Sequence, residues 1–226
     1  MLAKRVLWFG AVCLVALCWQ VAPAGAALYG FTPVSFNSGA AANAMAAQLS
    51  LDVTQLGSYA LFSFVNDGPV TSTITGTYFD DGAGVLDSLL KPVNGPGVNF
   101  RLGGTPANLP APQAPYHFRA DFWATANAPK GLGKKGVDNT GEIVTLPFTL
   151  ESGRSFTDVL TALGAGQADP TSTGGTLRVG IHVQSIGTAD TSDAFLLTPA
   201  DAPLPGALVL GLLGLSIAGL TMRRLA

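Results

Sequence analysis

Cysteine is almost absent from this chain of 226 residues, and the only two, Cys13 and Cys18, lie near its start. No disulfide can therefore form beyond position 18, even in an oxidising compartment. The same absence excludes thiol catalysis, cysteine-ligated zinc and iron–sulfur clusters from the rest of the chain. Histidine is nearly as scarce, because His117 and His182 are the only two. A catalytic triad or a histidine-rich metal site has little to draw on, and we expect no cofactor and no metal.

Positive charge is also scarce between the two ends of the chain. Four of the 12 basic residues are Lys4, Arg5, Arg223 and Arg224, which leaves eight basic residues against 14 acidic ones and a net charge of −6. Nucleic-acid binding needs clustered Lys and Arg that replace counterions, so we expect no nucleic-acid partner.

The first 26 residues have the order of a secretory signal peptide. Lys4 and Arg5 precede an apolar segment at 6–19, and small residues follow up to Ala26 and Ala27. A basic start, a short apolar core and a small-residue exit predict export by the Sec machinery, with cleavage after Ala26 or Ala27. Cleavage there would remove both cysteines.

The C-terminal end combines prolines, an apolar run and a basic pair. Pro203, Leu204 and Pro205 come first, an uncharged run of 17 residues fills 206–222, and Arg223 and Arg224 close it. At about 1.5 Å per residue, 17 helical residues approach the roughly 30 Å of a bilayer's hydrocarbon core. The arginines favour the cytoplasmic side. We therefore predict a membrane-spanning helix at 206–222, a basic cytoplasmic end at 223–226 and a linker with the tripeptide at 199–205.

Residues 27–198 have the composition and patterning of a β protein. Gly, Thr, Ser and Asn are abundant, and apolar residues alternate with polar ones in several short segments. The expected strands are 49–54, 59–65, 70–79, 98–102, 117–125, 142–150, 177–186 and 194–197. In the strand at 177–186 we expect Leu177 and its alternates to face inward and Arg178, His182 and Gln184 to face outward.

One helix is expected after Ser155. Ser155 and Asp158 form a capping-box pattern, an apolar stripe follows at helical spacing, and Gly164 is expected to end the helix. Many short strands, one short helix and no βαβ rhythm predict an all-β fold, an antiparallel β-sandwich of the jelly-roll type.

The C-terminal order of residues resembles a known sorting signal. Pro203, Leu204 and Pro205, the Gly- and Leu-rich apolar run and the terminal arginines together resemble the PEP-CTERM signal in its VPLPA-type variant, which is found on exported proteins of Gram-negative bacteria that make exopolysaccharide. The resemblance covers about 24 residues. Leu204 stands where the usual tripeptide has glutamate.

This resemblance implies a fate for the protein. An exosortase, a transpeptidase-like enzyme of the membrane, would recognise the tripeptide and helix and cut near Pro203, Leu204 and Pro205. The precursor would be anchored in the inner membrane, and the mature form would reach the cell surface or extracellular matrix. The chain would then be a substrate without chemistry of its own.

Two residues are candidate ligand contacts of the domain at 27–198. Trp123 alternates with the expected core face of its strand and could stack on a sugar, although a half-buried structural role is the simpler interpretation. His182 lies on the polar face of its strand, where a surface role is the simpler interpretation.

Three alternative functions remain for the protein: a non-enzymatic exported surface or matrix protein, a polysaccharide-binding module or adhesin that could contact exopolysaccharide, and a secreted hydrolase. A hydrolase needs a pocket that gathers His117 or His182 with distant carboxylates. The adjacent Asp80 and Asp81 cannot supply both carboxylates themselves, because neighbours on a strand face opposite ways.

Overall fold

A computed structural model describes residues 27–110, 112, 114–127, 135–138 and 140–198. These residues form 11 strands, two α-helices and one 3₁₀ turn. The elements are β1 (Ala27–Pro33), α2 (Ala40–Ala46), β2 (Leu49–Leu56), β3 (Tyr59–Asn66), β4 (Thr73–Asp81), β5 (Leu86–Leu89), β6 (Val93–Asn94), β7 (Phe100–Leu102), β8 (Phe122–Ala126), β9 (Val144–Leu150), α3 (Phe156–Ala168), β10 (Leu177–Ile186), η2 (Gly187–Ala189) and β11 (Thr191–Thr198).

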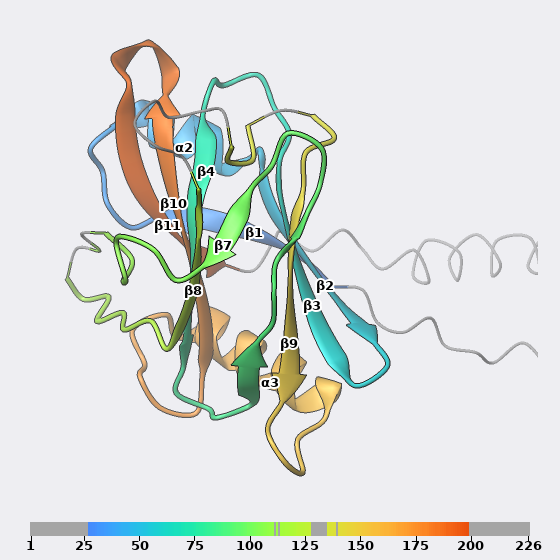
Figure 1. Ribbon diagram of the computed structural model, residues 1–226. Helices are drawn as coiled ribbons and strands as arrows, with labels where there is room; N and C mark the ends of the chain where they lie inside the picture. The colour runs from blue at the N-terminus through green and yellow to red at the C-terminus, as the bar shows by residue number, and fades with distance from the viewer. Residues whose placement is uncertain (1–26, 111, 113, 128–134, 139, 199–226) are drawn as a thin grey trace, which may run out of the picture.

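The strands form one antiparallel sheet in the order β5-β9-β3-β2-β1-β11-β10-β4-β8-β7, with β6 also paired to β9. Strand β1 joins two halves, because Ala27 to Tyr29 pair with β2 whereas Gly30 to Pro33 pair with β11. We call the part from β5 to β2 half-sheet A and the part from β11 to β7 half-sheet B. The two halves face each other (Figure 1), so the sheet is nearly closed into a barrel.

The core between the half-sheets is built from aromatic side chains. Phe62 of β3, Phe79 of β4 and Phe148 of β9 are fully buried and meet edge-to-face, with ring centroids 4.7 to 5.4 Å apart. Aromatic pairs in this geometry stabilise beyond the apolar area that they bury, by about 0.5–1.5 kcal/mol each. Two strands of half-sheet A and one of half-sheet B are thereby held together.

The expectation of a mostly β, antiparallel domain is confirmed. The strands expected at 49–54, 59–65, 142–150 and 177–186 are confirmed as β2, β3, β9 and β10, and the one expected at 194–197 lies within the longer β11. Between β2 and β3 the chain turns at Gly57, whose φ of 59° suits glycine better than any residue with a Cβ. The expected strands at 98–102 and 117–125 are shorter, since β7 starts at Phe100 and β8 at Phe122.

The helices extend beyond the prediction. The capping box is confirmed, because Ser155 Oγ accepts from the Asp158 N–H while the Asp158 carboxylate accepts from the Ser155 N–H. Gly164 does not end α3 as expected, and the helix continues to Ala168. The second helix, α2, was not predicted. It is an alanine-rich turn whose Ala42 and Met45 enter the core.

The outer face of half-sheet B is covered by another part of the chain, which corrects the expectation that one face of β10 is exposed to solvent. Arg178 and His182, expected on an exposed face, are only 2% and 7% exposed. Residues 103–110 and 114–121, which we call the covering segment, pass over this face and bring Leu109 and Phe118 into a second apolar cluster with Tyr78 and Leu196. A Cβ at Gly180 would lie 2.9 Å from Leu109 Cδ2, so the glycine gives Leu109 its room.

Candidate functional site

The predicted sorting residues fall almost entirely outside the described residues. These are Ala26, the tripeptide Pro203, Leu204 and Pro205, and the basic pair Arg223 and Arg224. Ala27 is described, and it opens β1 opposite Val53 of β2. In the described part of the chain no helix has both the length and the apolar character needed to span a membrane, and the predicted span at 206–222 lies beyond that part.

His182 lies on β10 between Gly76 of β4 and Ala194 of β11. Its Nδ1 is 3.4 Å from Thr75 Oγ1. Burial lowers the pKa of His182 from 6.5 to about 4, and the nearby Asp193 carboxylate opposes that change. At neutral pH the imidazole is therefore uncharged and enclosed, which is a structural setting rather than a surface one.

Trp123, the other candidate contact, borders an open groove. The groove has a volume of about 310 Å³. Such a volume is at the lower end of the range for small-molecule sites, about 300–1,000 Å³. We call it the seam groove, and its lining residues are Asp87, Ser88, Leu89, Leu102, Gly103, Asp121, Phe122 and Trp123.

The seam groove lies where the sheet fails to close. Strands β5 and β7 are the two ends of the sheet order, and the groove is lined by residues of both. Part of the seam is bridged by Asn94 of β6, whose Nδ2 donates to the Phe100 carbonyl oxygen (3.1 Å) while its Oδ1 accepts from the Phe100 N–H (2.7 Å). The Asn94 side chain thus replaces one pair of ladder hydrogen bonds, and the groove occupies the part of the seam that remains open.

The groove combines apolar and acidic lining. Asp87 Oδ2 accepts from Thr149 Oγ1 (2.8 Å) and Ser88 Oγ (3.2 Å), and Asp121 Oδ2 accepts from the Asp81 N–H (2.8 Å). Within the described residues, the Oδ1 atom of each carboxylate accepts no hydrogen bond. Both Asp87 and Asp121 are exposed, so these oxygens can accept hydrogen bonds from a ligand.

Asp81 of β4, whose N–H donates to Asp121, is itself held in place by hydrogen bonds. The Asp81 carboxylate accepts from the N–H groups of Val85 and Leu86, and so fixes the turn that leads into β5. Burial raises the pKa of Asp81, the backbone hydrogen bonds oppose this, and the charge of Asp121 adds to it. Asp80 points the other way, toward Arg178. The expectation that Asp80 and Asp81 face opposite sides is confirmed.

Arg178 and Asp80 form a buried ion pair beneath the covering segment. The Arg178 guanidinium also donates to the carbonyl oxygens of His117 and Pro170 (2.9 Å each) and lies 5.5 Å from the centre of the Phe118 ring. Its Nε–H has no hydrogen-bond partner among the described residues. Asp80 Oδ2 also accepts from the Arg119 N–H, so the pair fastens the covering segment to half-sheet B.

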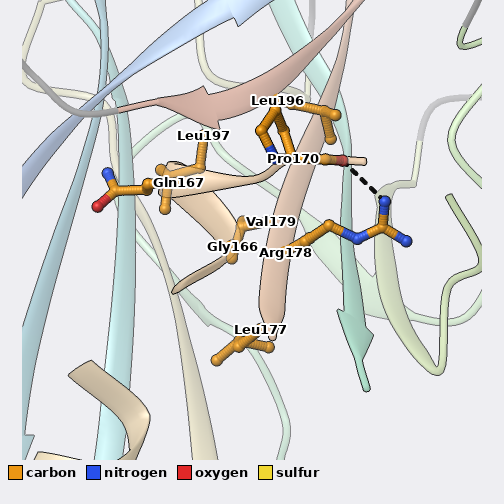
Figure 2. Close-up of a pocket in the computed structure, with 8 residues that line it drawn as sticks. All are labelled: Gly166, Gln167, Pro170, Leu177, Arg178, Val179, Leu196 and Leu197. Carbon is orange, nitrogen blue, oxygen red and sulfur yellow. Dashed lines mark hydrogen bonds between the residues drawn. The ribbon is translucent and has the colours of Figure 1, made fainter. Parts of the chain in front are cut away.

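A second hollow lies beside Arg178, between α3 and strands β10 and β11. Figure 2 shows its lining, with the Arg178 side chain extending to the Pro170 carbonyl oxygen. The hollow has no room for a water molecule. It is a packing imperfection, and we assign it no ligand.

The structure does not bring the two candidate contacts together. Trp123 lines the seam groove, whereas neither His182 nor His117 does. Sequence patterns did not indicate Asp87, Asp121 or Leu102 as groove residues, because they lie far apart in the chain and meet only through the sheet order. The described residues contain no cluster of three or more His, Cys, Asp or Glu able to hold a metal.

Comparison with known proteins gives no relative: no family model, no curated protein and no solved structure matches this chain.

Proposed function

We propose that this protein is a non-enzymatic exported protein of the cell surface or extracellular matrix, sorted by its C-terminal tail. The observation that carries the proposal is the order of residues after 202: Pro203, Leu204 and Pro205, then the apolar run at 206–222, then Arg223 and Arg224. The signal-peptide pattern at 1–26 supports the same route. Both patterns belong to a precursor that crosses the inner membrane of a Gram-negative bacterium and stops there.

The proposed precursor has five parts. They are the signal peptide at 1–26, a jelly-roll-like β-sandwich at 27–198, the linker and tripeptide at 199–205, the transmembrane helix at 206–222 and the basic end at 223–226. The pairing of β1 with β11 is consistent with this plan: Gly30 lies opposite Thr198, so both ends of the described domain leave it on the same side. A domain tethered through 199–205 would then have its other end near the membrane as well.

In this proposal the chain is the substrate of an exosortase. The short helix holds the tail in lipid, and the arginines fix its depth. The prolines keep the cleavage region extended, since a residue that precedes proline is biased away from helix. Cleavage near Pro203, Leu204 and Pro205 would separate the β domain from its anchor.

The test is the processing of tail variants in a host that makes exosortase. We expect mass spectrometry of the wild-type protein to find an N-terminus at Ala27 or Leu28 and a C-terminus near the tripeptide. The double variants Pro203→Ala/Pro205→Ala and Arg223→Glu/Arg224→Glu should accumulate uncleaved precursor. Pro69→Ala and Arg154→Glu, at exposed positions of the β domain, are matched controls that should be processed normally. Normal processing of both tail variants would refute the proposal.

A second candidate function, a polysaccharide-binding module or adhesin, is favoured by the seam groove. Its lining places an aromatic ring beside carboxylates in an open site, a combination suited to sugars. Saccharide binding is compatible with tail sorting, because sorting concerns the delivery of the domain and saccharide binding concerns what the delivered domain does.

A further inference from the structure

We propose that the seam groove binds an uncharged saccharide, stacked on Trp123 and Leu102 and hydrogen-bonded by Asp87 and Asp121. The inference rests on the second candidate function and names its ligand class and its residues. It does not depend on how the tail is processed.

The apolar side of the site is fixed in place. Trp123 is half-buried, and its indole N–H donates to the Gly104 carbonyl oxygen at 3.1 Å. Because that donor is already used, the indole offers a ligand its ring rather than a hydrogen bond. Leu102, on the neighbouring strand β7, is 48% exposed although it is a large apolar residue. An aromatic ring next to an exposed leucine suits the C–H face of a pyranose ring, which is apolar and flat.

The polar side selects for hydroxyl donors without negative charge. Asp87 and Asp121 each present one carboxylate oxygen that accepts no hydrogen bond from the described residues, and a sugar hydroxyl donating to it makes a charge-assisted bond. The lining residues include no Lys or Arg. A uronic acid or a sulfated sugar would therefore meet two carboxylates without a compensating cation, so acidic saccharides should be rejected.

An added peptide strand fits the groove less well than a sugar. Strands β5 and β7 have only four and three residues, and the pairing of β5 with β9 is irregular between Leu86 and Ser88. The N–H and carbonyl groups of Phe100 are already bonded to Asn94. Strand addition needs a row of free backbone groups along an edge, and these short edges do not supply one.

The experiment titrates the full chain, in detergent micelles, with cellotetraose and with tetragalacturonate. The Trp123 indole N–H resonance, assigned with Trp123→Phe, reports the groove, and calorimetry gives affinities. We expect millimolar or tighter binding of cellotetraose that shifts this resonance, and no binding of tetragalacturonate. Asp87→Asn should weaken binding about tenfold, since one charge-assisted hydrogen bond is worth about that much. Leu102→Glu should weaken binding about tenfold or more, because it replaces the apolar contact with a charged side chain.

Two matched substitutions control for surface changes as such. Leu56→Glu, at a 63% exposed leucine of the β2–β3 hairpin, and Asp190→Asn, at an exposed aspartate before β11, should leave binding unchanged.

Binding that survives Leu102→Glu and Asp87→Asn would overturn the placement of the site while leaving a saccharide-binding function. Absence of binding, or equal binding of tetragalacturonate, would overturn the ligand class. Neither result would touch the sorting proposal, which is tested by processing. Preferential binding of an extended peptide at the same resonance would identify a strand-docking edge instead.

Discussion

Acidification should destabilise this domain through His182, a residue that its strand pattern places at the surface. The side chain is 7% exposed, and burial is the main reason why its pKa falls from 6.5 to about 4. A low pKa in the folded state means that folding favours the neutral imidazole. Above pH 6.5 the histidine is neutral in both states and its contribution is complete. As the pH falls from 6.5 toward 4, the unfolded chain takes up the proton first and stability is lost.

The size of the effect follows from the two pKa values. A difference between 6.5 and about 4 corresponds to about 3 kcal/mol, at 1.36 kcal/mol for each pKa unit. Domains of this kind have total stabilities of about 5–15 kcal/mol, so a loss of about 3 kcal/mol is readily measured. The variant His182→Gln keeps a polar side chain but cannot be protonated in this range.

The assay is urea unfolding of the wild type and of His182→Gln between pH 4 and pH 7.5. Carboxylates also titrate in this range, so the informative quantity is the difference in unfolding free energy between the two proteins. We expect that difference to move by about 3 kcal/mol in favour of the variant between pH 7 and pH 4. His117→Gln, at an exposed histidine, controls for the loss of a histidine as such. A difference that stays constant with pH would refute the argument, as would an NMR titration of His182 with a midpoint above 6.

Three further substitutions probe the described fold. Arg178→Met should cost about 3–5 kcal/mol in unfolding free energy because it leaves the buried Asp80 carboxylate without its cation, and addition of Asp80→Asn should restore part of the loss; additive losses would contradict the pairing. Phe148→Ala should cost about 3–5 kcal/mol, since its ring meets three other phenylalanine rings, and a loss below 1 kcal/mol in thermal or urea unfolding would contradict that packing. Asn94→Ala should cost about 1–3 kcal/mol and speed amide hydrogen exchange at Phe100, whereas unchanged exchange there would show that Asn94 does not bridge the seam.

Local patterns predicted the elements whose burial is one-sided. Strand β2 alternates buried and half-buried residues along Leu49 to Thr54, and the capping box at Ser155 marks the start of α3. Proline in a strand is usually confined to an edge or a bulge, and Pro147 lies in β9, which is inside the sheet but pairs with β5 through a register shift. The proline is accommodated because, among the described residues, neither β5 nor β6 has a register partner opposite it, and its carbonyl oxygen accepts from the Leu90 N–H.

The two-sided burial of β10 could not be predicted from its own residues. Arg178, Gly180 and His182 alternate with apolar residues in the way that an exposed face does. Arg178 and Gly180 are covered by groups distant in sequence, among them His117 and Leu109 of the covering segment. That segment is rich in proline and glycine, so its sequence shows neither helical nor strand periodicity. Its position is set by contacts made across long sequence separations, such as that of Leu109 with Gly180. The groove was missed for the same reason, although the alternation at Trp123 correctly indicated that this side chain is turned away from the main core.

The covering segment links the buried ion pair to the seam groove. Its first residues, Gly103 and Gly104, accept hydrogen bonds from Thr125 and Trp123, and its last, Asp121, accepts from the Asp81 N–H. Between them, the carbonyl oxygen of His117 and the N–H of Arg119 bond to the Arg178–Asp80 pair. Two walls of the groove are therefore the two ends of a segment whose middle is fastened by a buried charge pair. It follows that the ion pair, although neither of its residues lines the groove, should affect how rigidly the groove is held. Arg178→Met should lower saccharide affinity even at temperatures where the variant is fully folded, and equal affinity in that variant would show that the ends of the segment hold the groove by themselves.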